Sequence, residues 1–225
     1  MFETHFLIHS QKECAHLIEM AGFLPFFANG IPGFSLQEHV DPTLWFTTET
    51  GPWEWKGPLI RDTHCAYGKF FANKAVFISK QWMMDFANYR RDGYDYDARY
   101  NDGLSAHRDR ECYELIEKYG PLLSKRLKKL GDYRKGEKKG FDTIITRLQS
   151  QGYVTISDFV YETKEDGTRY GWGVAEYATL EQWYGAEYIR KMYQRTPEQS
   201  YQRMMKHLKT ILPQAEKKQL EQILK

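Results

Sequence analysis

Apolar and polar residues change their spacing within the segment GFDTIITRLQSQGYVTISDF, which covers residues 140–159. In its first half the apolar side chains recur three and four positions apart, which is the repeat of a helix with one buried face. These side chains are Phe141, Ile144, Ile145 and Leu148. After Gly152 the chain becomes rich in β-branched residues, which favour strands. The pattern therefore predicts a helix over 141–151 that leads into a strand.

The flanking patterns predict a winged helix-turn-helix at residues 106–180. Before the helix, apolar spacing predicts one helix that ends at Gly120 and a second, basic helix that begins at Pro121. After it, two runs at 153–161 and 169–177 are separated by an Asp-Gly pair, which is a hairpin signal. Three helices followed by a hairpin is the order expected of a winged helix-turn-helix.

The N-terminal residues 1–88 show a related order of helices and a hairpin. Ser10 and Glu13 have the spacing of a capping box, which predicts a helix over 10–21. The run YGKFFANKAVFIS predicts two strands that turn near Asn73. We therefore interpret this part as a divergent second winged module, and the chain as an α+β protein with tandem winged-helix modules.

Two further segments complete the chain. Residues 89–105 are dense in Tyr, Arg and Asp without a clear period, so we interpret them as a linker whose tyrosines pack on the flanking domains. The alternative for this segment is an aromatic surface that stacks on single-stranded bases. Residues 181–225 are predicted to form a helical tail that braces the fold, because Thr196 and Pro197 provide a helix start before an amphipathic stretch.

Composition narrows the class of protein. The chain has 225 residues, of which 41% are hydrophobic, so it can form a substantial core. No stretch approaches the roughly 18 apolar residues of a membrane span, and the N-terminus lacks a signal-peptide pattern, which together predict a cytoplasmic protein without a membrane partner. Three widely spaced cysteines, and the lack of a phosphate-binding loop or zinc motif, predict no cofactor and no metal.

Basic charge is concentrated, although the formal net charge is only +2. Residues 124–139 hold eight basic side chains against two acidic ones, which suits contact with a polyanion. The polar face of the predicted 141–151 helix carries hydroxyl groups and a guanidinium, which contact bases and phosphates when such a helix enters the major groove. We predict a duplex-DNA interface formed by Lys125, Arg126, Lys128, Lys129, Lys138, Lys139, Thr143, Thr146, Arg147, Ser150 and Arg169. The alternatives are a solvated basic helix and a non-catalytic module that binds another protein.

Six segments together resemble those of the bacterial AlkZ-related proteins. In chain order they are GFSLQEH, GPWEWK, YGKFFANKAVFIS, NYRRDGYDYDARY, GFDTIITRLQSQGY and YGWGVAEY. The resemblance implies tandem winged-helix modules and a distant kinship to winged-helix DNA glycosylases, which excise alkylated bases or unhook crosslinks. Those glycosylases carry an active-site Gln-x-Gln or Gln-x-Asp, whereas the corresponding region here has Gln37-Glu38-His39. The departure at His39 leaves two alternatives open, an active DNA glycosylase and a DNA-binding relative without that activity.

A glycosylase needs aromatic walls around an extruded base and a polar group that orients water at the sugar. Trp53 and Trp55 are the candidates for stacking on a base, and the candidate catalytic residues are Gln37, His39 and Glu54. If residues 53–55 form a strand, the two tryptophans share one face and Glu54 points to the other. Packing of both tryptophans in the core is the alternative explanation.

Overall fold

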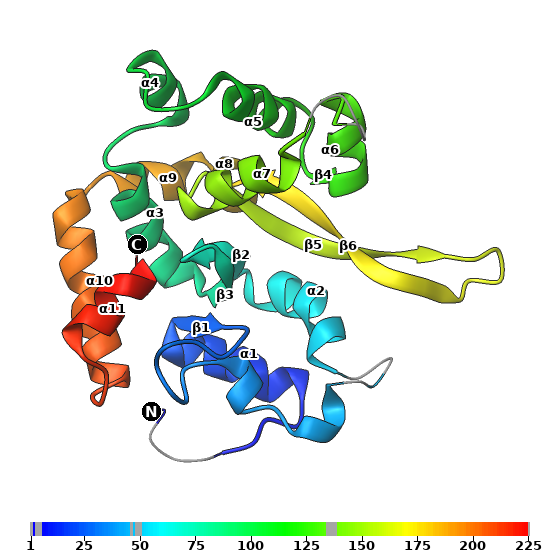
Figure 1. Ribbon diagram of the computed structural model, residues 1–225, viewed down its shortest axis with the longest axis vertical. Helices are drawn as coiled ribbons and strands as arrows, with labels where there is room; N and C mark the ends of the chain where they lie inside the picture. The colour runs from blue at the N-terminus through cyan, green and yellow to red at the C-terminus, as the bar shows by residue number, and fades with distance from the viewer. Residues whose placement is uncertain (1, 3–5, 46, 48–50, 134–138, 225) are drawn as a thin grey trace.

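The first helix begins and ends at the residues that its capping pattern predicts. The computed structural model (Figure 1) describes residues 2, 6–45, 47, 51–133 and 139–224. In helix α1 (Gln11–Ala21), Ser10 Oγ accepts a hydrogen bond from the Glu13 amide at 3.3 Å. The helix ends at Gly22, whose φ of 74° strongly favours a residue without a side chain. The helix predicted at 10–21 is confirmed.

Short elements connect α1 to the next long helix. They are β1 (Phe23–Pro25) and two 3₁₀ helices, η1 (Leu36–Glu38) and η2 (Pro42–Leu44). Ser35 caps η1, because its Oγ accepts a hydrogen bond from the Glu38 amide at 3.3 Å. The described part of the segment between α1 and α2 thus consists of short elements, and both 3₁₀ helices begin with a side-chain cap.

The tryptophan pair of the GPWEWK segment lies in a helix. Helix α2 (Pro52–Thr63) begins with proline at its first position, where the missing N–H removes no helical hydrogen bond. The strand considered for residues 53–55 is therefore wrong. The helical repeat directs Trp55 into the core, where it is 5% exposed, and leaves Trp53 half-buried.

The two strands predicted around Asn73 are confirmed. They are β2 (Ala66–Phe71) and β3 (Lys74–Ile78), and they pair antiparallel. Ala72 and Asn73 connect them with positive φ angles of 45° and 62°. Two consecutive positive φ angles are characteristic of a tight hairpin turn whose twist matches that of the strands.

The second half contains the predicted three helices and hairpin. The helices are α5 (His107–Tyr119), α6 (Ser124–Leu130) and α7 (Phe141–Ser150), and the hairpin strands are β5 (Val154–Thr163) and β6 (Arg169–Thr179). One boundary differs from the prediction, because Leu122–Leu123 form a short strand, β4, that pairs with Tyr177 and Glu176 of β6. The basic helix consequently starts at Ser124 rather than at Pro121.

The described strands form a single six-stranded antiparallel sheet that joins both halves of the chain. The order is β1-β3-β2-β5-β6-β4, and the link between the halves is the pairing of β2 with β5 at Tyr67 and Ile156. Helix α7 packs on β2 and β5, while α2 also packs on β5. The β5–β6 hairpin projects from the body of the protein, with α6 on one side of it and α2 on the other (Figure 1).

The Tyr-rich segment 89–105 packs against the core. Helix α3 (Lys80–Arg91) ends within it, and α4 (Tyr96–Asn101) follows. Tyr96 is buried and stacks on Tyr113 of α5 with 3.9 Å between ring centroids. Tyr96 therefore packs inward against α5. The short length of α4 explains why the segment lacked a clear period.

The tail is helical, as predicted. It contains α8 (Leu180–Tyr184), α9 (Ala186–Met192), α10 (Pro197–Ile211) and α11 (Lys217–Leu224). Helix α10 packs on α3, where the Ser200 hydroxyl donates a hydrogen bond to the buried Asp85 carboxylate at 2.9 Å. Among the described residues, no helix combines the length and the apolar character that crossing a membrane requires.

Candidate nucleic-acid interface

The outward side of α7 carries part of the predicted interface. The four apolar residues that predicted the helix are buried, whereas Thr143 is exposed and Thr146 is half-buried. Ser150 differs from the prediction, because it is buried and its hydroxyl donates to the Arg147 carbonyl at 3.0 Å. Arg90 of α3 covers this end of the helix by donating to the Ser150 carbonyl at 2.8 Å. The accessible hydroxyl groups of α7 are therefore those of the two threonines.

Arg147 is held by a buried carboxylate. Its Nε and Nη2 donate hydrogen bonds to the two carboxylate oxygens of Asp109 at 2.5 and 2.6 Å, and the Asp109 side chain is only 2% exposed. These hydrogen bonds raise the pKa of Arg147 above its ordinary value. The pair fixes the guanidinium, so Arg147 cannot swing freely into a groove as the sequence alone suggested. Its Nη1 makes no hydrogen bond to any residue within the described ranges.

The basic residues of α6 divide into paired and unpaired cations. Lys125 forms an ion pair with Glu162 of β5, and Lys128 lies 3.8 Å from the Asp142 carboxylate. Arg126 and Lys129 are exposed and have no acidic partner in the part of the chain that the structure describes. These two side chains are the cations of α6 most available to a polyanion.

Of the remaining predicted cations, the structure describes Lys139 and Arg169. Lys139 is exposed just before α7, and its carbonyl accepts a hydrogen bond from Arg108 at 3.4 Å. Lys138 lies outside the described residues. The Arg169 guanidinium, on β6, lies 5.4 Å from the Tyr161 ring centroid of the same hairpin. Arg108 is a further cation near the start of α7, and sequence reasoning missed it because it lies in the preceding helix, α5.

The β5–β6 hairpin exposes aromatic side chains that the sequence analysis did not single out. Trp172 is 74% exposed and Tyr170 is 46% exposed. The Trp172 ring meets the Trp53 ring of α2 edge to face, with 5.9 Å between centroids. The residue pattern YGWGVAEY contains the signal for this surface, because an aromatic residue between glycines on a projecting strand has little to pack against.

A lysine is enclosed by aromatic rings where α2 faces the hairpin. Lys56 Nζ lies 4.2 Å from the ring centroid of Phe159 and 4.7 Å from that of Trp53. Burial lowers the pKa of Lys56 to about 8, and the nearby Glu54 carboxylate partly opposes this shift.

Trp55 is in the core and is therefore not available to stack on a base.

The three candidate catalytic residues lie in different environments. His39 is buried, with Nε2 at 2.7 Å from the Gly33 carbonyl and Nδ1 at 3.2 Å from the Phe6 carbonyl, so neither ring nitrogen faces solvent. Gln37 is exposed, but its Oε1 accepts a hydrogen bond from the Ala28 amide at 3.0 Å. Glu54 differs, because its buried Oε2 accepts no hydrogen bond from the residues that the structure describes.

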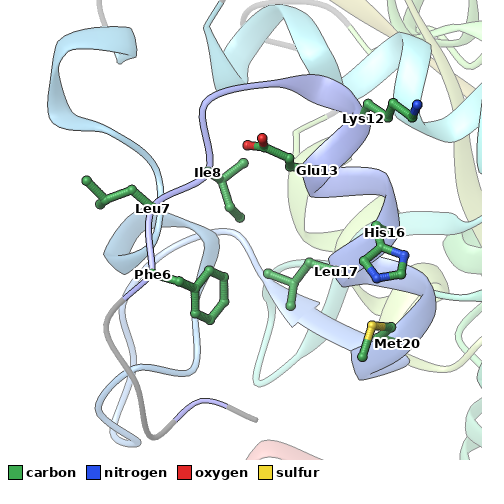
Figure 2. Close-up of a pocket in the computed structure, with 8 residues that line it drawn as sticks. All are labelled: Phe6, Leu7, Ile8, Lys12, Glu13, His16, Leu17 and Met20. Atoms are coloured by element: carbon green, nitrogen blue, oxygen red, sulfur yellow. The ribbon is translucent and has the colours of Figure 1, made fainter.

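A separate hollow lies between the N-terminal segment and α1, and Figure 2 shows the residues that line it. Its volume is about 470 Å³, and its walls are mainly apolar, with Phe6, Leu7, Ile8, Leu17 and Met20 among them. Lys12 and Glu13 contribute one charge of each sign. Because this hollow is apolar and has no excess of cations, it is not part of the basic surface formed by α6 and α7.

Comparison with known proteins identifies the family of the chain. The family model described as AlkZ related matches residues 8–225, which is nearly the whole chain. The protein therefore belongs to the AlkZ-related family, as its six sequence segments suggested. No curated protein and no solved structure matches the chain.

Proposed function

We propose that this member of the AlkZ-related family binds duplex DNA through a winged helix, in which α7 enters the major groove and the β5–β6 hairpin is the wing. The order of α5, β4, α6, α7, β5 and β6, with β4 paired to β6, supports this assignment. The antiparallel β2–β3 hairpin after α1 and α2 supports a divergent second module in the first half.

The observation that carries the proposal is that α6 exposes cations without a described acidic partner, while α7, which Lys128 and Asp142 link to α6, exposes hydroxyl groups. Arg126 and Lys129 of α6 are exposed, and the neighbouring α7 exposes Thr143 and, partly, Thr146. Cations on the helix before a recognition helix contact phosphates, and hydroxyl groups on the recognition helix fit base edges. Lys125 joins α6 to the wing through Glu162, so these elements form one connected surface.

The test is duplex binding measured by fluorescence anisotropy at several salt concentrations. Each phosphate that a protein neutralises contributes about 0.9 to the slope of log affinity against log salt. Replacing both Arg126 and Lys129 by alanine should flatten the slope by about 1.8, because two phosphate contacts are lost. The matched control replaces Lys206 and Lys218, exposed residues of α10 and α11, which lie across the molecule from α6 (Figure 1). This control should leave the slope unchanged.

Two outcomes separate the proposal from its rival. Loss of slope in the Arg126 and Lys129 variant, but not in the control, would support the α6–α7 interface. If the protein binds no duplex even at low salt, the protein-interaction module becomes the better interpretation. Co-purification from cells would then identify the bound protein.

A second candidate function is base excision, and Glu54 favours it. Its Oε2 is buried without a hydrogen bond from a described residue, and it lies in the first turn of α2 next to Trp53. A carboxylate beside an aromatic wall is the arrangement that base excision requires. Gln37 and His39 contribute less to this proposal, because their polar atoms already bind backbone groups of the protein itself.

Base excision is tested with duplexes that carry alkylated purines or interstrand crosslinks. Incubation followed by alkali cleaves the strand at any abasic site that the protein has produced. Glu54→Gln should abolish cleavage in a protein of intact fold, whereas Glu38→Gln, a change in an exposed carboxylate of η1, should not. Cleavage that survives in Glu54→Gln would remove Glu54 from the mechanism.

A further inference from the structure

A polar groove runs between α7 and the β2–β3 hairpin. Its volume is about 500 Å³, and it is lined by Lys69 and Asn73 from the hairpin and by Asp142, Thr143, Thr146, Arg147 and Ser150 from α7. The α7 residues recur along one side of the helix, so the groove follows that side and does not depend on the helix N-terminus. The sequence analysis assigned no binding role to Lys69 or Asn73.

The two walls of the groove are held together at a fixed distance. Gln149 Oε1, on α7, accepts a hydrogen bond from the Lys69 amide at 2.9 Å, and its Nε2 donates to the Ile145 carbonyl at 3.1 Å. Gly68 permits this close approach, because a Cβ there would lie 2.6 Å from Gln149 Oε1. The groove is therefore built by packing of α7 on β2 and does not arise from a chance arrangement of surface side chains.

Hydrogen-bond donors predominate in the groove. Lys69 is an exposed cation without an acidic partner in the described part of the chain, and Asn73 is exposed at the hairpin turn. Thr143 and Thr146 line the groove with them, and so does Arg147, whose Nη1 is not used by Asp109. The carboxylate in the lining, Asp142, lies 3.8 Å from Lys128 Nζ, which offsets its charge.

We propose that this groove binds a backbone phosphate of the DNA duplex, and that the β2–β3 hairpin thereby acts as a second wing beside α7. An ammonium, a guanidinium, an amide and hydroxyl groups are the side chains that bind phosphate oxygens in protein–DNA complexes. Helix α7 packs on both β2 and β5, so a duplex that receives α7 in its groove would have one hairpin beside each edge of the helix. This inference rests on the proposed DNA-binding function and adds a contact outside the winged unit.

The experiment compares two lysines of the same hairpin. Lys69 lines the groove, whereas Lys74 is also exposed but is not part of its lining. Lys69→Ala should lower the slope of log affinity against log salt by about 0.9, since one phosphate contact is lost. Lys74→Ala should match the wild type, and Lys69→Arg should retain the slope because it keeps the charge.

Replacing the uncharged hydrogen-bond donors of the groove provides a second test, measured as duplex affinity. Thr146→Val removes a hydroxyl group at nearly constant shape, and Asn73→Gly removes the amide while tolerating the positive φ of 62°. Each should weaken duplex binding several-fold without changing the salt slope, because no charge is lost. Thermal unfolding of every variant checks that the fold is retained.

Competition by inorganic phosphate tests whether the groove binds a DNA backbone phosphate or a free phosphate ion. At constant ionic strength, replacing chloride by phosphate should weaken duplex binding by the wild type more than by Lys69→Ala. If Lys69→Ala abolishes binding of inorganic phosphate but leaves duplex binding and its salt slope unchanged, the groove binds free phosphate and the proposed duplex contact is wrong. A slope that depends on Arg126 and Lys129 but not on Lys69 would overturn the second wing alone, whereas absence of duplex binding would overturn the proposed function itself.

Discussion

The guanidinium of Arg147 and the carboxylate of Asp109, 38 positions apart in the chain, form a two-point contact that fixes α7 against α5. Asp109 is buried and Arg147 is 42% exposed in its side chain, so the arginine covers a charge that would otherwise lie unpaired inside the protein. The only arginine of the predicted recognition helix is thus a structural residue first. Its contribution to DNA contact is limited to the donors that remain.

Removing this arginine should destabilise the protein. Arg147→Ala leaves the Asp109 carboxylate buried without its partner, which we expect to cost about 3 kcal/mol of the free energy of unfolding. Urea unfolding followed by circular dichroism measures the change. Thr143→Ala, an exposed change on the same helix, is the control and should stay within about 0.5 kcal/mol of the wild type. Equal stability of Arg147→Ala and Thr143→Ala would show that the ion pair has no structural role.

Lys56 should make stability depend on pH in the alkaline range. Its pKa is about 8 in the folded protein, below the ordinary value of 10.5, so the folded state binds fewer protons than the unfolded state between these values. The free energy of unfolding contributed by this group should therefore rise as the pH increases from about 8 towards 10.5. Urea unfolding of wild type and Lys56→Met at several pH values measures the contribution as a difference between the two proteins. The prediction fails if the two proteins show parallel pH profiles over this range.

Replacing Trp172 or Trp55 by alanine should have very different effects on the free energy of unfolding. Trp172→Ala removes a mainly exposed ring, so the free energy of unfolding should change by less than about 1 kcal/mol. Trp55→Ala empties part of the core and should cost about 3–5 kcal/mol. If the β5–β6 hairpin contacts DNA, Trp172→Ala should nevertheless weaken duplex binding several-fold in the anisotropy assay. Unchanged affinity would remove Trp172 from the interface.

Gly68 and Gln149 should be energetically coupled. A side chain at Gly68 would lie 2.6 Å from Gln149 Oε1, so Gly68→Ala should cost about 1–3 kcal/mol through displacement of α7 from β2. Combining it with Gln149→Ala removes the clash, and the double variant should be more stable than the sum of the two single effects predicts. Additive effects in a double-mutant cycle would show that the two residues do not meet.

The elements that could be predicted from the sequence are those that depend on neighbours a few positions apart. Phe141, Ile144 and Leu148 defined α7 through the helical repeat, and Ser10 and Thr196 defined helix starts through caps that bind amides three residues on. These interactions are local, so the pattern is complete within one segment. The strand considered for residues 53–55 failed because three residues are too few to distinguish a strand from the first turn of a helix.

Which distant groups come into contact could be seen only in the folded structure. The pairing of β2 with β5, the contact of Trp53 with Trp172, and the position of Lys69 beside α7 each join segments far apart in the chain. The fold also determines which residues of one type are buried, since Trp55 lies in the core while Trp172 is exposed. The periodicity of a segment shows which of its faces is apolar, but it does not show which other element covers that face. That choice depends on the packing of the whole core, in which distant segments compete for the same surface.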